Sequence, residues 1–325
     1  MKNALRISLL LIALLFLLAW RFAPARQASD EPEPSGEVRR PDAAVPDHTR
    51  TLRVLHGGAV EEMTMDEYLL GVLRAEMPAS FELEALKAQA VAARTFACRQ
   101  TAGGKHENAD VCAQSACCQA CLTVEDLRAR YGDGFEAAWD KALAAVRETQ
   151  NEVLTYEGAL IDAVYFSCSG GSTEDAAAVW GTDVPYLRAV ESPGEHDAAK
   201  YESRVCVTAE TFAETLRALD ASAQLSGDPS GWVQSVTRTP GGGVDTLTAG
   251  GRSFSGVQLR KAFGLNSTRF TLLYEDGAFS FDVHGYGHRV GMSQYGANAI
   301  ARLGFDYRTI LRFYYRGAEL TTLDF

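Results

Sequence analysis

Residues 65–101 read MDEYLLGVLRAEMPASFELEALKAQAVAARTFACRQT, and this stretch predicts two consecutive helices. Thr64 can cap the first helix, over residues 65–77, in which apolar residues recur at helical spacing. Pro78 ends this helix, because the residue before a proline is pushed out of the α region. The alanine-rich segment 81–101 predicts the second helix.

Glu76 stands at the end of the first predicted helix. The partial negative charge of a helix C-terminus disfavours a carboxylate and raises its pKa, which suits a general acid near neutral pH. From the position alone, a glutamate that simply faces water is the favoured interpretation. Lys87 and Arg94 share one face of the second helix. They predict either a sugar- or carboxylate-binding face beside Glu76, where they would lower its pKa, or a solvated helix face.

The rest of the chain predicts further helices and many short strands. Helical patterns cover 135–149, 208–219 and much of 293–315. Strand patterns dominate the middle of the chain, with hairpin turns at residues 241–243 and 276–277. This order predicts an α+β fold. We expect a helical N-terminal part packed on antiparallel strands, a groove between two lobes, and an inserted lobe around residues 195–265.

The N-terminus predicts export. Lys2 and Arg6 precede an apolar run over residues 7–20, which is shorter than the roughly 17–25 residues of a membrane-spanning helix. The run fits a signal peptide cleaved near residues 23–25, or an uncleaved anchor that snorkelling arginines lengthen. Pro24 and the flanking arginines make a poor cleavage region and favour the anchor. We assign 1–26 to this segment, the proline-rich 27–51 to a flexible linker, and 52–325 to the folded domain.

Composition narrows the class of protein. The chain has 46% apolar residues, enough for a substantial core, and a net charge of −11. An acidic chain of this kind argues against a nucleic-acid partner, whose binding normally needs a basic face. Net charge says little about a sugar polymer, where hydrogen bonds and stacking matter more.

Four of the seven cysteines lie close together, at Cys112, Cys117, Cys118 and Cys121, with His106 just upstream. Adjacent cysteines hardly bridge each other, and the odd total disfavours a disulfide framework. Thiolates and imidazole are ligands that zinc prefers, so a zinc site is the leading interpretation, with disulfides or free thiols as alternatives. Cys121 is a rival ligand. The remaining cysteines, predicted to be buried thiols, are Cys98, Cys168 and Cys206.

Several separated blocks of the sequence resemble the stage II sporulation protein D family. These blocks are residues 75–81 with 84–95, 165–173, 179–181 with 185–187, and 285–297. They occur in the expected order and cover nearly everything from residue 52 to 325. Arg289 stands where the family usually has glycine, and Ser-Cys-Ser at 167–169 is a second variation.

The resemblance implies a peptidoglycan lytic transglycosylase. It would cleave MurNAc–GlcNAc bonds of peptide-stripped glycan strands, leave 1,6-anhydroMurNAc ends, and act in septal wall remodelling and engulfment during sporulation. The family's acidic residue corresponds to Glu76, which would protonate the glycosidic oxygen and then take the proton of the MurNAc C6 hydroxyl. The catalytic domain would then be residues 52–325.

The resemblance also implies binding residues. The substrate-binding positions are expected at Lys87, Arg94, Ser167, Ser169, Tyr186, His288, Gln294 and Tyr295. Trp180 is expected in the core. The family's zinc site, of two histidines and two cysteines, corresponds to His106, Cys112, Cys117 and Cys118, with Cys117 in place of a histidine, and would be structural.

The implied partners are glycan strands, a cell-wall amidase and a membrane scaffold protein of the engulfment machinery. The implied location is the cell membrane, with a single-pass anchor and the catalytic domain outside the cytoplasm, in the intermembrane space during sporulation. Two alternatives remain. One is a non-catalytic, glycan-binding enhancer of an amidase, and the other is a zinc hydrolase. A zinc deaminase is excluded, because its His-x-Glu motif is absent.

Overall fold

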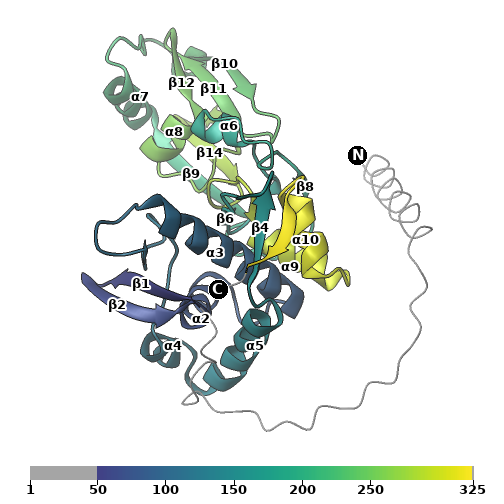
Figure 1. Cartoon of the computed structure of the whole chain (residues 1–325). Coiled ribbons are helices and arrows are strands. Elements are labelled where there is room, and N and C mark those ends of the chain that lie inside the picture. Colours follow the sequence, from purple (N-terminus) through teal and green to yellow (C-terminus); the bar gives the residue numbers. More distant parts are fainter. Residues whose placement is uncertain (1–49, 324–325) are drawn as a thin grey trace, which may run out of the picture. The chain divides into compact units, whose positions relative to one another are not determined.

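The computed structural model describes residues 50–323 (Figure 1). The predicted membrane segment and nearly all of the linker lie outside these residues. Within 50–323, no helix is both long and apolar enough to cross a bilayer. The described residues form helices and several small, mainly antiparallel sheets, which confirms the predicted α+β class.

The first lobe contains most of the helices. Its N-terminal elements are β1 (Thr51–His56), β2 (Ala59–Thr64), α2 (Met65–Glu76), α3 (Leu83–Gly103), β3 (Val111–Cys112), α4 (Val124–Tyr131), η1 (Gly132–Gly134) and α5 (Phe135–Glu148). Short strands and one helix follow: β4 (Glu152–Tyr156), β5 (Ala159–Leu160), β6 (Tyr165–Phe166), β7 (Gly171–Ser172), α6 (Ala176–Trp180) and β8 (Glu191–Ser192). The chain returns to this lobe with β15 (Met292–Ser293), α9 (Gln294–Arg302), α10 (Tyr307–Tyr314) and β16 (Glu319–Thr322).

The two helices predicted from residues 65–101 are present. Thr64 caps α2 through a capping box, in which its hydroxyl accepts from the Glu67 N–H and the Glu67 carboxylate accepts from the Thr64 N–H. The helix ends at Glu76, and the next residue is extended, as the following Pro78 requires. The second helix begins at Leu83, two residues later than predicted, and lies fully buried along most of its length. It contacts α2, α5, α9 and α10 and forms the centre of the first hydrophobic core.

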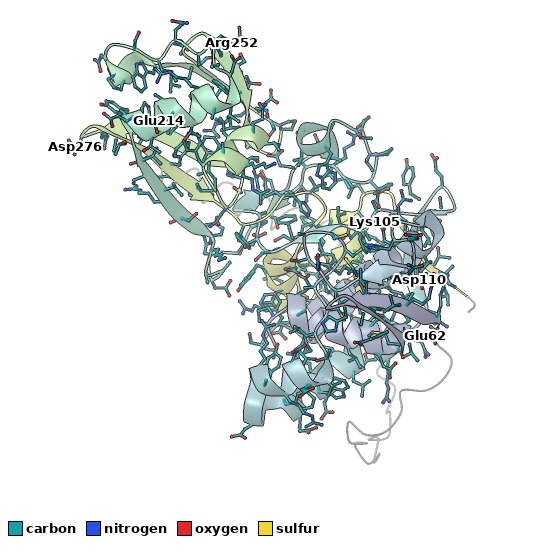
Figure 2. All side chains as sticks on the ribbon, turned by 90° about the vertical axis from the view of Figure 1, so that its left-hand side faces the viewer. Glu62, Lys105, Asp110, Glu214, Arg252 and Asp276 are labelled. Atoms are coloured by element: carbon teal, nitrogen blue, oxygen red, sulfur yellow. The ribbon has the colours of Figure 1, made fainter. Side chains whose placement is uncertain are left out.

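The second lobe has a hydrophobic core of its own. Its elements are β9 (Glu202–Thr208), α7 (Ala209–Leu219), η2 (Pro229–Gly231), β10 (Val233–Arg238), β11 (Val244–Ala249), β12 (Arg252–Ser255), α8 (Gly256–Ala262), β13 (Phe270–Glu275) and β14 (Ala278–His284). The predicted hairpin turns join β10 to β11 and β13 to β14. The buried residues of this core extend from Ala209 to Val283. In one of its sheets, β14 is the central strand and pairs with both β13 and β9. Figure 2 shows Glu214, Arg252 and Asp276 on this lobe and Glu62, Lys105 and Asp110 on the first.

Arg289 joins the two lobes. Its fully buried guanidinium donates to the carbonyl oxygens of Ser169 and Ser172 in the first lobe and of Gly241 in the β10–β11 turn of the second. It also pairs with the buried carboxylate of Glu174 at 3.1 Å. The Glu174 carboxylate in turn accepts from the N–H of Gly243. These buried polar contacts link the second lobe to the first.

Candidate active site

Glu76 lies at the C-terminus of α2 with its carboxylate in a half-buried position. Its Oε1 accepts a hydrogen bond from the Ala120 N–H at 3.1 Å. Burial raises the pKa of Glu76, and the contacts with Ala120 and Gln294 partly offset that rise. A raised pKa was expected from the helix terminus, but the main cause is desolvation. The contacts that lower the pKa of Glu76 come from the Ala120 backbone N–H and the Gln294 side chain, not from Lys87 or Arg94 as predicted.

A hydrogen-bond network holds the backbone that contacts Glu76. The Tyr165 hydroxyl donates to Gln119 Oε1 at 2.6 Å. The Gln119 amide then donates to the Tyr68 hydroxyl and to the Ala93 carbonyl oxygen. Gln119 is almost fully buried, and Ala120 is the next residue. The N–H that contacts Glu76 therefore sits on a rigid support, as a preorganised site requires.

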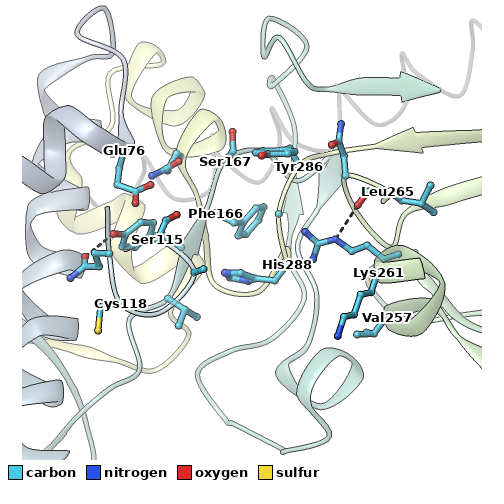
Figure 3. A pocket seen from close by; sticks show the side chains of 18 of the residues that line it. Glu76, Ser115, Cys118, Phe166, Ser167, Val257, Lys261, Leu265, Tyr286 and His288 are labelled. Carbon is cyan, nitrogen blue, oxygen red and sulfur yellow. Dashed lines mark hydrogen bonds between the residues drawn. The ribbon is translucent and has the colours of Figure 1, made fainter. Parts of the chain in front are cut away.

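A groove runs past Glu76 on both sides. Its wide arm is a cavity of about 970 Å³, and its narrow arm is a cavity of about 400 Å³. Glu76, Ser167 and Gln294 line both arms, so both arms border Glu76. Figure 3 shows the wide arm, with Glu76 on the first-lobe wall and Lys261 on the second-lobe wall. This arrangement agrees with the predicted groove between two lobes.

The structure brings four of the predicted substrate-binding residues to this groove. Ser167 and Gln294 lie beside Glu76, His288 lines the wide arm and Tyr295 lines the narrow arm. The His288 ring lies between Phe166 and the side chain of Trp180, and burial lowers its pKa to about 4. It is therefore neutral at physiological pH. Its Nδ1 accepts from the Val290 N–H.

Lys87 and Arg94 do not line the groove, contrary to prediction. Lys87 Nζ forms ion pairs with Glu84 at 2.7 Å and with Glu148 at 2.5 Å. Arg94 is 1% exposed, and its guanidinium donates to backbone oxygens of Val146, Thr149 and Glu152. The two cations share one face of α3, as their spacing requires, but that face meets α5 and β4. They stabilise the packing of these elements.

Ser169 and Tyr186 also lie away from the groove, contrary to prediction. The Ser169 hydroxyl is fully buried and donates to Glu195 Oε1 at 2.8 Å. The Tyr186 hydroxyl accepts from the Asp162 N–H, and its ring contacts Tyr156. Both residues hold loops of the first lobe together.

Other groove residues were not predicted from the sequence. Trp180, expected in the core, is 47% exposed; it lines neither arm, but its ring lies 5.4 Å from that of His288, which lines the wide arm. The unpredicted lining residues include Ser115, Gln119, Arg130, Tyr131, Arg260, Lys261, Asn266 and Tyr286. Nothing in their local sequence distinguishes them from ordinary loop or helix-surface residues. Tyr286 is the exception, because it falls within the matching block 285–297.

Four of the predicted metal ligands form a cluster. The donor atoms of His106, Cys112, Cys117 and Cys118 all lie within 4.8 Å of one another. Cys121 is outside this cluster, because its thiol faces the Tyr68 carbonyl oxygen. All seven cysteines belong to the described residues, and none of them forms a disulfide.

The remaining cysteines were predicted to be buried. Cys98 and Cys168 are buried, but Cys206 is exposed, because it lies on the outer face of the edge strand β9. The metal-ligand cluster borders the groove, since Cys118 lines the wide arm and lies two residues before Ala120.

Comparisons with known proteins give the family of the chain. A family model described as "Stage II sporulation protein" matches residues 56–156. Stage II sporulation protein D of Bacillus subtilis is 36% identical over 270 residues, which cover 82% of this chain and 77% of that protein. The chain belongs to the stage II sporulation protein D family. The protein of the same name from Bacillus amyloliquefaciens is 35% identical over 82% of this chain and 76% of its own.

The family takes part in sporulation. It also extends to a relative with a different name. An amidase enhancer of Bacillus subtilis is 30% identical over 312 residues, which cover 78% of this chain and 40% of that protein.

The raised pKa of Glu76 predicts how stability depends on pH. The folded state holds the Glu76 proton more tightly than the unfolded chain, so the charged carboxylate destabilises the fold once pH exceeds the ordinary glutamate range. We expect Glu76→Gln to be more stable than wild type at neutral pH. The difference in unfolding free energy between the variant and wild type should grow by at most about 1.4 kcal/mol per pH unit, over the range between the pKa of Glu76 in the unfolded chain and its pKa in the folded protein. Below both pKa values the difference should vanish.

Urea unfolding of both proteins across a pH series measures this difference, because all other titrating groups cancel. Glu125→Gln, an exposed position on α4, is the control and should show no such trend. A stability difference that does not change with pH would contradict the prediction.

Proposed function

We propose that this protein is a peptidoglycan lytic transglycosylase that cleaves MurNAc–GlcNAc bonds of peptide-stripped strands and leaves 1,6-anhydroMurNAc ends. The observation that carries the proposal is a half-buried carboxyl with a raised pKa that lines both arms of the groove. A polymer lying along both arms would present an internal bond to Glu76. The test is the mass of the products from amidase-treated glycan, where each anhydro end is lighter than a hydrolysed end by one water.

The lining of the groove favours this reaction over ordinary glycoside hydrolysis. Among the described residues that line the two arms, Glu76 is the only acid. Hydrolysis by the common mechanisms needs two carboxylates that flank the bond. A transglycosylase needs one residue that acts first as an acid and then as a base.

The proposed sequence of steps uses only Glu76 and the substrate. The protonated carboxyl of Glu76 gives its proton to the glycosidic oxygen, and the bond from MurNAc C1 to that oxygen breaks. GlcNAc leaves with a free hydroxyl. The MurNAc O6 then bonds to C1, and its hydroxyl proton returns to Glu76. The carboxyl is regenerated and no water is consumed.

The electrostatic surroundings of Glu76 suit both roles. Burial favours the protonated form that starts the reaction. The Ala120 N–H stabilises the carboxylate that forms when the leaving group is protonated. Gln294 and Ser167 supply hydrogen-bonding groups for sugar hydroxyls, and the neutral His288 lines the same cavity. Trp180 adds an exposed ring beside His288 that suits contact with a sugar face.

Its cellular setting follows from the same proposal. We place the protein at the cell membrane through its N-terminal segment, with the catalytic domain in the intermembrane space during engulfment. A cell-wall amidase would supply the peptide-stripped strands, and a membrane scaffold would hold both enzymes. The amidase-enhancer relative supports a second candidate function, in which the same groove binds glycan without cleaving it and stimulates the amidase.

We also propose that His106, Cys112, Cys117 and Cys118 hold a structural zinc ion. Zinc bonds of about 2.0–2.3 Å place tetrahedral donors within about 4 Å of each other, close to the spacing of these four donors. Three thiolates and one imidazole are a typical closed ligand set. Bound zinc would cross-link the loop that carries Gln119 and Ala120.

This proposal predicts the effect of removing a ligand. Cys118→Ser should lose bound zinc and lower the thermal unfolding temperature, because metal-binding free energy contributes to folding. Cys206→Ser, an exposed cysteine outside the cluster, should keep both the metal and the unfolding temperature of wild type. Elemental analysis and thermal unfolding of the purified proteins measure the two quantities.

The kinetics of zinc removal separate this proposal from a zinc hydrolase. If zinc carried out the chemistry, chelation would stop turnover at once, before any unfolding. A structural zinc predicts that loss of activity follows unfolding in time. Wild type that contains no zinc after purification from zinc-supplemented cells would overturn the proposal.

A further inference from the structure

The groove carries a charge opposite to that of the chain as a whole. The chain has a net charge of −11. Three cations, Arg130, Arg260 and Lys261, line the two arms of the groove against the single acid Glu76. A cationic cleft in an acidic protein concentrates anions.

These cations lie on both sides of Glu76. Arg260 and Lys261 belong to the last turn of α8 in the second lobe and line the wide arm. In Figure 3, Lys261 lies across the cavity from Glu76. Arg130 belongs to the last turn of α4 in the first lobe and lines the narrow arm. A ligand that occupied both arms would meet positive charge before and after the position of Glu76.

The structure gives these cations no acidic partner within residues 50–323, although the Arg130 guanidinium donates to the carbonyl oxygens of Arg74 and Ala75 at 3.3 and 3.4 Å. None of the ion pairs among residues 50–323 includes Arg130, Arg260 or Lys261. Arg260 is half-buried, and burial lowers its pKa, yet the only hydrogen bond of its guanidinium within that range is a long one of 3.4 Å to the Leu265 carbonyl oxygen. Exposed arginines elsewhere on the second lobe, Arg204 and Arg252, are each paired with an aspartate. A partly desolvated cation without an acid is suited to an anionic ligand.

We propose that Arg130, Arg260 and Lys261 bind the free lactyl carboxylates of MurNAc and thereby select strands whose stem peptides have been removed. The inference rests on the proposed function, which supplies the substrate class. In a strand that carries peptides, the lactyl group is joined to the peptide by a neutral amide. Hydrolysis of that amide leaves a carboxylate on every second sugar, so the stripped strand is a regular polyanion. Cations on both sides of Glu76 fit such a strand, whereas in a peptide-bearing strand the lactyl position itself is a neutral amide and gives them no anionic partner beside the sugar.

The test separates binding from catalysis by using Glu76→Gln as the background. Peptide-stripped strands are compared with the same strands after their lactyl carboxylates have been converted to methylamides. Binding is measured by calorimetry at low and high salt. We expect the amidated strands to bind about tenfold more weakly, and salt to weaken only the binding of the carboxylate form.

Variants then assign the effect to residues. Lys261→Gln and Arg130→Gln should each weaken binding of the carboxylate form several-fold and leave binding of the amidated form unchanged. Lys261→Arg should restore affinity, because it keeps the charge. The matched control is Arg316→Gln, which removes one exposed cation outside the groove. Thermal unfolding of each variant shows that it is folded.

The outcomes distinguish this inference from the proposed function. Equal affinity for the carboxylate and amidated strands, or equal losses for both in Lys261→Gln, would overturn the inference. If wild type cleaves both strands at the same rate, the inference fails while the proposed function stands. If the carboxylate form binds better but wild type produces no anhydro ends, the proposed function fails while the inference stands.

Discussion

Replacement of Glu76 by glutamine is expected to reduce formation of 1,6-anhydroMurNAc ends by about 10²–10⁴-fold while leaving glycan binding intact. Glutamine has nearly the same shape and can still accept the hydrogen bond from the Ala120 N–H. It cannot donate a proton to the glycosidic oxygen or take one from the C6 hydroxyl. No other acid lines the groove among residues 50–323, so no neighbour can take over either step.

Mass spectrometry of products from amidase-treated strands measures this effect directly. Glu125→Gln changes the same chemical group at an exposed position on α4 and should retain wild-type activity. Undiminished anhydro product from Glu76→Gln would contradict the assignment of Glu76 as the acid. If wild type itself forms no such product but stimulates an amidase, the enhancer function is the correct one.

Local signals in the sequence predicted the helices that position the acid. Thr64 and Pro78 fixed the ends of α2, because capping and proline sterics act within a few residues. The cysteine cluster was also predictable from spacing, since its ligands all come from one loop. The hairpin turns through Gly242 and Gly277 were also predictable from local sequence, because tight hairpin turns need residues with positive φ, and both glycines have it.

The rest of the site depends on which surfaces meet in three dimensions. Helical spacing correctly put Lys87 and Arg94 on one face of α3, but it could not show that this face meets α5 and β4. Trp180 was expected in the core, yet it lies half-exposed beside a histidine that is distant in sequence. Arg130 and Lys261 belong to different lobes and reach one groove only through the tertiary fold. The main cause of the Glu76 pKa shift, burial, is likewise a property of the assembled site.

Replacement of Arg289 by alanine is expected to lower the free energy of unfolding by about 3–5 kcal/mol. Its guanidinium is fully buried, pairs with Glu174 at 3.1 Å and donates to three backbone oxygens, at distances of 2.7–2.9 Å. Burial lowers the pKa of Arg289 only to about 10, so the residue stays charged at neutral pH. Alanine would leave the Glu174 carboxylate buried without a cation.

Matched variants separate the ion pair from the backbone geometry. Arg289 has a φ of +66°, a backbone conformation that is strained for every residue except glycine. The free energy of unfolding of Arg289→Gly should therefore be about 1 kcal/mol higher than that of Arg289→Ala. Arg302→Ala breaks an exposed pair with Asp197 and should cost no more than about 1 kcal/mol. Urea unfolding measures all three variants, and a loss in Arg289→Ala as small as that of Arg302→Ala would contradict the role of the buried pair.

The same variant links stability to the groove. Arg289 contacts the Gly241 carbonyl oxygen of the second lobe, and that lobe carries Arg260 and Lys261 on the wall opposite Glu76. If the buried pair fixes the separation of the two walls, Arg289→Gly should weaken glycan binding under conditions where the protein remains folded. Binding in the Glu76→Gln background measures this effect apart from catalysis. Unchanged affinity would show that the pair stabilises the fold without setting the width of the groove.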